Sequence, residues 1–556
     1  MAEPDDDDLP IATPIPPATP TEPVKPVRAG RPVEPKPRRR EAMPAERETD
    51  HKPPRARTFM ACGVLGCLVI CVLAAVGFVT FAAIMLLGQV GNELADRTNE
   101  PPPPTKSMRA DRPGPVLQTK LAADTTVELP GPITAVCRGA NGRFLLMQVK
   151  TPTENQILVF DPNEGKLLDP LVFSPSEPAP VFAAGATKLF VYRSGRIERY
   201  NLTSREAPEA TAPFNLPVQA LAAGAGADDL LYAFTLQPPG MRVWVLDGET
   251  LTDRGFEFKV DRPVGKNSAR TSANGRLVGL SGATSLPGAL IPGAAGRGQF
   301  FTFNGSVITS KQFAVTDVPG HVAPSPDGQW LYTSRGVFKP DGKPVLTKKV
   351  GYLYTLPAAQ GSDLFLSQYA PNATVQLKLN LHSFRASDPA AGVHLETVDG
   401  PTPLPADDMT TSIPADLRTH FWPAAGLVAV LPPVDLRGNQ PPLRLYKIKV
   451  GELLTELPGH EKYVYIATDP PVYATRGEKW TYPLFAWSSS AVVKYRLTSA
   501  PVGMTSTDMD NNAGQVTWTV PADFQPTEAE VVIEAKAGDE KTTQKFTLTI
   551  VDPHNP

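Results

Sequence analysis

The sequence predicts an all-β protein: a β-propeller of about seven blades followed by a β-sandwich, preceded by one transmembrane helix and a disordered N-terminal tail. Three observations support this prediction: a long uncharged apolar run, a turn-and-strand unit that recurs seven times, and longer alternating strands near the C-terminus. The predicted segments are 1–58 (tail), 59–88 (transmembrane helix), 89–119 (spacer), 120–462 (propeller) and 463–556 (sandwich).

The apolar run extends from Phe59 to Leu87 and contains no charged residue. At about 1.5 Å per residue, a helix of this length exceeds the ~30 Å hydrocarbon core of a bilayer. The flank before the run is rich in Arg and Lys, whereas Glu93, Asp96 and Glu100 follow it. The positive-inside rule therefore predicts that residues 1–58 are cytoplasmic and that the C-terminal domains lie outside the cytoplasm.

A cleaved signal peptide is the main alternative, because Ala74-Ala75 and Ala82-Ala83 are small residues late in the run. Signal peptides have short n-regions and apolar cores of roughly 7–15 residues, however, and this run starts near residue 59 and is about twice as long. A buried core helix is the second alternative, but runs of this length are rarely buried in a globular domain. We therefore expect an uncleaved signal anchor.

Proline is about twice as frequent as its usual share of roughly 5%, with 62 Pro in 556 residues, and the N-terminal tail supplies much of the excess. Residues 1–58 show no apolar periodicity, so they cannot bury enough surface to offset the entropy of ordering, and we expect a disordered arm. Beyond the membrane, Pro101 to Pro104 begin a stiff spacer. Cys137 is the only cysteine on the exterior side, which excludes an intramolecular disulfide there.

Between about 125 and 460, short β-branched and aromatic runs alternate with turn residues, and helical periodicity is lacking. A turn of Gly, Asp, Asn or small residues precedes an apolar strand, and the next strand often ends in Asp or Asn. This unit recurs at 141–146, 185–191, 228–232, 274–278, 326–332, 361–366 and 424–430. Spacings of roughly 35–65 residues match one four-stranded blade per unit, as expected for a β-propeller.

The run Ser325-Pro326-Asp327-Gly328-Gln329-Trp330 resembles a repeat of the WD-repeat and related bacterial propeller families. No unit carries the Gly-His and Trp-Asp pair of the WD-repeat family. Six or eight blades, or an irregular double sandwich, therefore stay open as alternatives. The stretch from Gly282 to Gly298 is rich in Gly, Ala and Pro, and we interpret it as a long blade loop.

From Tyr465 onward the strands lengthen and alternate. The order of features is distinctive. A Tyr-x-Leu strand and an Ala-Pro-x-Gly-Met turn lie within 495–504, and a Gly-x-Val-x-Trp strand lies within 514–521. A further strand at 531–537 and a closing Phe-x-Leu strand within 546–551 follow. The order resembles the bacterial putative-immunoglobulin, dystroglycan-type cadherin-like domain over roughly 85 residues. The resemblance implies an Ig/cadherin-like β-sandwich with Trp518 packed between its two sheets.

The cadherin-like resemblance raises the question of a Ca²⁺ site at Asp508 and Asp510, where Asp-x-Asp-x-Asn begins like a calcium loop. Ala513 replaces the sharp-turn Gly and Thr519 replaces the bidentate Glu, so a polar hairpin turn is favoured. The seven histidines form no metal-ligand spacing. The stretch 279–283 lacks one Gly of a nucleophile elbow. We therefore predict no metal and no cofactor, and catalytic residues stay unassigned.

Two functions remain open. The first is a non-catalytic binding or scaffold protein, held by a single membrane span in the bacterial cytoplasmic membrane, whose periplasmic domains engage another envelope protein or a polysaccharide. The alternative is a propeller-type hydrolase or lactonase with its site in the central channel, because such sites assemble from separate blades. The missing catalytic and metal spacings favour binding. A net charge of −3 gives no basis for nucleic-acid binding, and the oligomeric state is not indicated.

Overall fold

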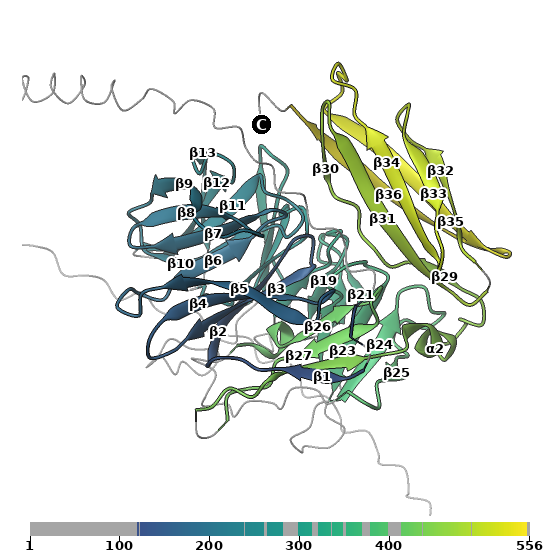
Figure 1. Ribbon diagram of the computed structural model, residues 1–556, viewed down its shortest axis with the longest axis horizontal. Helices are drawn as coiled ribbons and strands as arrows, with labels where there is room; N and C mark the ends of the chain where they lie inside the picture. Colours follow the sequence, from purple (N-terminus) through teal and green to yellow (C-terminus); the bar gives the residue numbers. More distant parts are fainter. Residues whose placement is uncertain are drawn as a thin grey trace, which may run out of the picture. The chain divides into compact units, whose positions relative to one another are not determined.

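The computed structural model describes residues 119–552, except 122, 238–239, 261–263, 282–297, 314–320, 335, 348–351, 370–377, 399–412, 436–437 and 491. The predicted tail, the predicted transmembrane helix and almost all of the predicted spacer lie outside the described residues. In the part that is described, every helix is too short or too polar to cross a bilayer. The described residues form nine four-stranded β-sheets (Figure 1).

Six of these sheets are antiparallel meanders in which the four strands follow one another along the chain. Blade 1 contains β2 (Ile133–Gly139), β3 (Phe144–Lys150), β4 (Asn155–Asp161) and β5 (Lys166–Phe173). Blade 2 contains β6 (Val181–Ala184), β7 (Lys188–Arg193), β8 (Arg196–Asn201) and β9 (Pro208–Pro213). Blade 3 contains β10 (Val218–Ala223), β11 (Leu230–Gln237), β12 (Gly240–Asp247) and β13 (Asp253–Val260).

The next three meanders repeat the arrangement. Blade 4 contains β14 (Ala269–Thr271), β15 (Leu277–Leu280), β16 (Gln299–Phe303) and β17 (Ile308–Gln312). Blade 5 contains β18 (Val322–Pro324), β19 (Leu331–Thr333), β20 (Gly336–Phe338) and β21 (Pro344–Thr347). Blade 6 contains β22 (Tyr352–Pro357), β23 (Leu364–Tyr369), β24 (Lys378–Ser383) and β25 (Val393–His394). The predicted blade loop Gly282–Gly298 connects β15 and β16, and all of it except Gly298 lies outside the described residues.

Blade 7 is built from both ends of the propeller. Its first three strands are β26 (Thr419–Trp422), β27 (Leu427–Val430) and β28 (Leu443–Lys447), and its outer strand is β1 (Thr125–Val127). Thr125 pairs with Leu445 and Val127 pairs with Leu443, antiparallel. The N-terminal strand therefore closes the ring of seven blades. The prediction of a β-propeller is confirmed, and the blade number is seven.

Each of the seven units found in the sequence forms the turn into the second strand of one blade. These turns comprise residues 140–143, 185–187, 224–229, 272–276, 325–330, 358–363 and 423–426. In a four-stranded meander, this turn and the turn between the third and fourth strands lie at the same end of the blade. We call this side of the propeller the hairpin face.

Burial explains the sequence pattern of the blades. The second strand of blade 1, β3, is buried on both faces from Phe144 to Val149 and is therefore almost continuously apolar. The outer strand of blade 3, β13, alternates between exposed and partly buried residues, with Phe256 and Phe258 packed against the core. The third strands β4 and β12 end in Asp161 and Asp247, whose Oδ1 atoms accept hydrogen bonds from backbone N–H groups two residues on, at 2.9 and 3.0 Å.

Neighbouring blades are joined on the hairpin face by hydrogen bonds between their turns. Six boundaries are spanned by Ala140 N to Gly185 O (2.8 Å), Gly226 N to Ala273 O (2.7 Å), Ala273 N to Pro326 O (2.8 Å), Asp327 N to Ser362 Oγ (3.4 Å), Ala359 N to Phe421 O (2.7 Å) and Trp422 Nε1 to Gly142 O (2.8 Å). Gly142 has φ +79°, and a Cβ there would lie 2.1 Å from Ala359 O, so this turn requires glycine.

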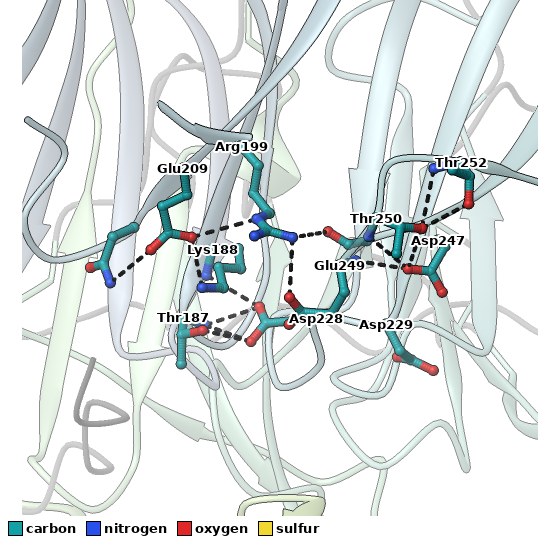
Figure 2. Close-up of polar contacts among 12 residues, drawn as sticks. Thr187, Lys188, Arg199, Glu209, Asp228, Asp229, Asp247, Glu249, Thr250 and Thr252 are labelled. Atoms are coloured by element: carbon teal, nitrogen blue, oxygen red, sulfur yellow. Dashed lines mark hydrogen bonds and ion pairs between the residues drawn. The ribbon is translucent and has the colours of Figure 1, made fainter. Parts of the chain in front are cut away.

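The seventh boundary, between blades 2 and 3, is held by the carboxylate of Asp228 (Figure 2). Its Oδ1 accepts hydrogen bonds from the backbone N–H groups of Thr187 (3.0 Å) and Lys188 (3.2 Å), and its Oδ2 accepts one from the Thr187 hydroxyl (2.8 Å). On the same side, Arg199 lies 3.5 Å from Glu209 and 3.1 Å from Glu249. A ring of polar contacts therefore links all seven blades on one face.

The two remaining sheets form a separate sandwich. One contains β29 (Val464–Ile466), β31 (Lys479–Ser488), β34 (Ala513–Thr519) and β33 (Thr505–Asp508). The other contains β30 (Tyr473–Thr475), β36 (Glu540–Val551), β35 (Glu528–Ala537) and β32 (Lys494–Ser499). Residues of both sheets build one core, which includes Tyr482, Val531 and the fully enclosed Trp518. The predicted packing of Trp518 between the sheets is confirmed.

The propeller and the sandwich are connected by a short helix that the sequence analysis did not predict. Helix α2 spans Val450–Thr455, and the 3-10 turn η2 spans Ala415–Leu417. Val450 and Leu454 of α2 are buried against the core of blades 6 and 7. Six residues are too few to display helical periodicity, which explains why no helix was expected before residue 460.

Candidate functional site

A cavity of about 90 Å³ lies in the channel on the propeller axis. The first strands of blades 1–5 line it, together with the turns of blades 1 and 3–6 on the hairpin face. Most of the lining side chains are small, among them Ala183, Ala184, Ala222, Ala223, Ala269, Ala323, Ala358 and Ala359. Alanine on converging inner strands leaves the axis unfilled, and a cavity of this size can hold several waters or a small molecule.

Two arginines bring positive charge to this cavity, Arg138 at the end of β2 and Arg270 in β14. Arg138 donates a hydrogen bond from Nη1 to Ala358 O at 3.1 Å. Burial and, less strongly, the charge of Arg270 lower the pKa of Arg138 to about 10, against the opposing charge of Asp416. Arg138 keeps part of its surface accessible although it lies deep in the protein, because that surface faces the cavity.

Arg270 forms a buried ion pair with Asp416 of η2. Its Nε and Nη2 atoms both lie 2.8 Å from Asp416 Oδ2, and the two side chains are only 8% and 3% exposed. Burial alone would raise the pKa of Asp416, but the neighbouring charge of Arg270 holds it below its usual value. Asp416 is therefore a stable carboxylate, and it is unsuited to accept a proton at neutral pH.

Two histidines lie near this ion pair but do not line the cavity. His321 Nε2 lies 2.7 Å from Thr355 O, and His420 Nε2 lies 2.8 Å from Leu417 O. Burial lowers the pKa of His321, and burial together with Arg138 lowers that of His420 to about 3. Each ring is therefore neutral and donates its Nε2 proton to a carbonyl oxygen, which makes both histidines structural donors rather than catalytic bases.

Cys137 is the one thiol among the described residues, and it also lines the cavity. Burial raises its pKa to about 12. The thiol therefore stays protonated at neutral pH, and it lacks the low pKa of a catalytic nucleophile.

Two asparagines bridge different blades at the two ends of the channel, Asn267 through its side chain and Asn141 through its backbone. Towards one end, Asn267 precedes β14 of blade 4 but bonds to β2 of blade 1, donating to Thr134 O (3.0 Å) and accepting from Val136 N (3.2 Å). On the hairpin face, the Asn141 N–H of blade 1 donates to Ala225 O of blade 3 at 2.5 Å. These two bridges link blade 4 to blade 1 and blade 1 to blade 3.

The segment between the first two strands of the sandwich, residues 467–472, binds to the hairpin face. Asp469 Oδ2 accepts a hydrogen bond from Gly361 N at 2.7 Å, and Asp469 O accepts one from Asn141 Nδ2 at 3.2 Å. Immediately afterwards, the Tyr473 hydroxyl donates to Asp229 Oδ1 at 2.5 Å. The segment is thus fixed to blades 1, 3 and 6.

Asp469 is an unusual residue in this segment because its carboxyl group is desolvated. Burial, with smaller contributions from the charges of Asp327 and Asp363, raises the pKa of Asp469 to about 7 against the hydrogen bond from Gly361. Asp363 is itself paired with Arg385 at 2.8 Å. The contact between the sandwich segment and the propeller therefore contains a carboxyl group that titrates near neutral pH.

Asp508 and Asp510, the residues of the possible Ca²⁺ site, lie at a hairpin of the sandwich. Asp508 Oδ1 accepts a hydrogen bond from Tyr495 N at 2.8 Å, and Asp508 Oδ2 lies 3.4 Å from Lys494 Nζ. Residues 509–512 form the hairpin turn between β33 and β34, in which Asn511 and Asn512 have positive φ angles. Across residues 119–552, outside the gaps, no group of three or more His, Cys, Asp or Glu side chains is arranged to hold a metal ion.

Arg138, Arg270 and Asp416 were not predicted as site residues from the sequence. The three residues are far apart in the chain and meet only because the blades close into a ring. A weak signal was present, since an isolated arginine interrupts the small and apolar inner strands at Val136-Cys137-Arg138 and Ala269-Arg270-Thr271. A charge in a strand that must face the axis indicates a polar feature in the channel.

No protein-family model and no curated protein sequence matches this chain. Among solved structures, the β-propeller domain of Cps50 (Swd1) from Myceliophteria thermophila is 11% identical, with a TM-score of 0.36 over 59% of this chain and 100% of that chain. Hsv2 from Kluyveromyces lactis is 10% identical, with a TM-score of 0.32 over 45% of this chain and 73% of that chain. The assignment of the middle region as a β-propeller rests on the strand order described above.

Proposed function

We propose that this protein acts by binding, as a membrane-anchored scaffold on the outer side of a bacterial cytoplasmic membrane. One observation carries the choice of binding over catalysis: the ionisable groups that reach the channel cavity are arginines and a protonated thiol. The nearby carboxylate of Asp416 is ion-paired with Arg270, and the nearby histidines are neutral hydrogen-bond donors. Hydrolysis of an ester or lactone requires a general base or a bound metal, and this arrangement favours neither.

The binding surfaces in this proposal are the loops of the propeller and an Ig/cadherin-like sandwich. The position of Trp518 in a core shared by two four-stranded sheets supports the assignment of the sandwich to that class. Side chains also tie the sandwich to the propeller: Trp487 Nε1 donates to Pro423 O at 2.9 Å, and the Tyr465 hydroxyl lies 2.6 Å from Ser383 Oγ. A fixed pair of domains suits the capture of another envelope protein or a polysaccharide.

The proposed topology predicts where reporter enzymes fused to the chain will be active. A periplasm-dependent reporter fused after residue 120 or after residue 556 should be active, because the basic flank before Phe59 favours a cytoplasmic N-terminus. A cytoplasm-dependent reporter at the same points should be inactive. The opposite result at both points would reverse the orientation.

The binding proposal predicts a specific partner in intact cells. Crosslinking followed by purification of the full-length protein should recover one partner protein or polysaccharide, and deletion of residues 1–58 should leave this recovery unchanged, because the binding surfaces lie in the C-terminal domains. A partner lost with the cytoplasmic tail would contradict the proposal.

The hydrolase alternative is tested with the purified full-length protein and ester, lactone or glycoside substrates. We expect no turnover above the uncatalysed rate. Turnover abolished by Asp416→Asn, but retained by the exposed control Asp539→Asn, would assign the protein to the enzymes.

A further inference from the structure

The channel cavity combines an excess of positive charge with walls that offer little to balance it. Arg138 and Arg270 line the cavity, and Asp416 is the carboxylate paired with Arg270. Arg270 directs Nε and Nη2 at Asp416 and donates from Nη1 to Asn267 O. The pair Arg270–Asp416 is therefore neutral as a unit, and Arg138 supplies one uncompensated positive charge.

Arg138 has no carboxylate within ion-pair distance among the residues that the structure describes. A single protein acceptor, Ala358 O, binds its Nη1 atom at 3.1 Å. A guanidinium group carries five N–H donors in a planar fork. Most of the donor capacity of Arg138 is thus available on the side where its remaining accessible surface faces the cavity.

A buried cation without a counter-charge is unfavourable, because protein surroundings replace its hydration shell with a medium of lower polarity. Three physical responses are available: hydration by water in the cavity, loss of the proton, or capture of an anion. Arginine keeps its proton at neutral pH even after burial, since its pKa here remains at about 10. Of the two responses left, only an anion supplies the opposite charge that the described residues of the cavity walls lack.

We propose that this cavity binds the oxyanion group of a small ligand, such as a phosphate, sulfate or carboxylate, through the guanidinium group of Arg138, with Arg270 adding positive charge from the neighbouring wall. Planar bidentate binding of such oxygens is the interaction that guanidinium groups form best.

The rest of the lining restricts the ligand class. Alanine, proline and leucine side chains form the walls, and no aromatic ring is among the described lining residues, so the site lacks a stacking surface for a nucleobase. The lining also offers no carboxylate to a metal cation. A compact oxyanion fits both restrictions. This inference concerns the propeller channel alone and does not depend on the proposed envelope partner.

The test uses the purified full-length protein and three forms of it: wild type, Arg138→Met and the control Arg496→Met. Methionine is close to arginine in length and removes the charge. Arg496 lies on the sandwich, where its side chain is 72% exposed and pairs with Glu534. Binding of inorganic phosphate is measured by calorimetry and by the thermal unfolding midpoint at fixed ionic strength, with acetate and sulfate as separate arms.

We expect saturable binding and a saturable rise of the unfolding midpoint for wild type and Arg496→Met, with at least tenfold weaker binding for Arg138→Met, because one bidentate ionic contact is lost. A rise that grows without saturation and is equal in all three forms reflects exclusion of the salt from the protein surface and overturns the proposal. The arm that binds most tightly distinguishes a phosphate or sulfate group from a carboxylate.

A second measurement keeps the proposal testable if Arg138→Met does not fold. A crystal structure of the wild-type protein grown in phosphate should place the anion on the guanidinium group of Arg138. An empty channel under saturating phosphate, or an absence of saturable binding of phosphate, sulfate and acetate to the wild type, would overturn it.

Discussion

Replacing Trp518 with alanine is expected to lower the free energy of unfolding of the sandwich by about 3–5 kcal/mol, the usual cost of removing a buried tryptophan. The indole is 1% exposed, lies edge-on to Phe524 with ring centroids 5.2 Å apart, and donates from Nε1 to Val502 O at 3.2 Å. Trp480 lies opposite it on the neighbouring strand. Alanine would leave a large cavity between the two sheets and one carbonyl without its donor.

The measurement is a denaturant titration of residues 463–556, whose two sheets share a single core. Because isolated domains have a total stability of about 5–15 kcal/mol, the substitution should shift the midpoint strongly or unfold the domain. Met509→Ala is the matched control, since Met509 lies in the turn before β34 and is 52% exposed. Its effect should stay within about 0.5 kcal/mol. Equal effects of the two substitutions would exclude Trp518 from the core in solution.

Replacing Asp469 with asparagine is expected to stabilise the protein at pH 8. The native pKa of Asp469 is about 7, against its usual value of 3.8, so folding at pH 8 forces an ionised carboxylate into a desolvated site. At about 1.36 kcal/mol per pKa unit, the cost is on the order of 4 kcal/mol. Asparagine removes the charge and keeps an oxygen acceptor for the Gly361 N–H group.

The sign of the pH dependence follows from proton binding. Between about pH 4 and pH 7 the native state holds the Asp469 proton and the unfolded state does not, so the stability of the wild type falls as the pH rises through this range. Asp327 and Asp363 face the same group, and burial raises the pKa of Asp363 as well, so part of the slope will remain in the variant.

Chemical unfolding of the full-length protein at pH 5 and pH 8 measures this effect. Asp469→Asn should gain stability relative to the wild type at pH 8 and little at pH 5, whereas the exposed control Asp539→Asn should follow the wild type at both. If the stability of Asp469→Asn changed with pH as steeply as that of the wild type, Asp469 would have to be hydrated in solution.

The sequence predicted the propeller well because the evidence for each blade is local. A turn with Gly, Asp or Asn followed by an apolar second strand can be recognised within about ten residues, as at Asn141–Leu146 and Pro326–Tyr332. The sandwich was predicted from a similar local pattern, since the buried Val516 and Trp518 alternate with less buried polar neighbours along β34.

The features that escaped prediction depend on partners distant in the chain. Strand β1 has only three residues, Thr125–Val127, and is defined by pairing with β28 more than 300 residues later. The channel arginines likewise come together only through ring closure, which places β2 and β14 on opposite sides of one axis. Neither kind of information is present in a local window of sequence.

The closure of blade 7 also determines how the propeller responds to mechanical tension. A pull between the chain before β1 and the chain after β28 acts on Thr125 and Leu445, which are paired at the same end of the antiparallel ladder, so the three residue pairs would peel apart one after another instead of sharing the load. Lys120 first transfers part of that load to blade 1, because its N–H donates to Asn163 O at 2.9 Å and its Nζ lies 2.7 Å from Glu164. Under load, the contacts of Lys120 with blade 1 and the hydrogen bond from Lys447 N to Asp124 Oδ1 (2.7 Å) must therefore break before the ring can open.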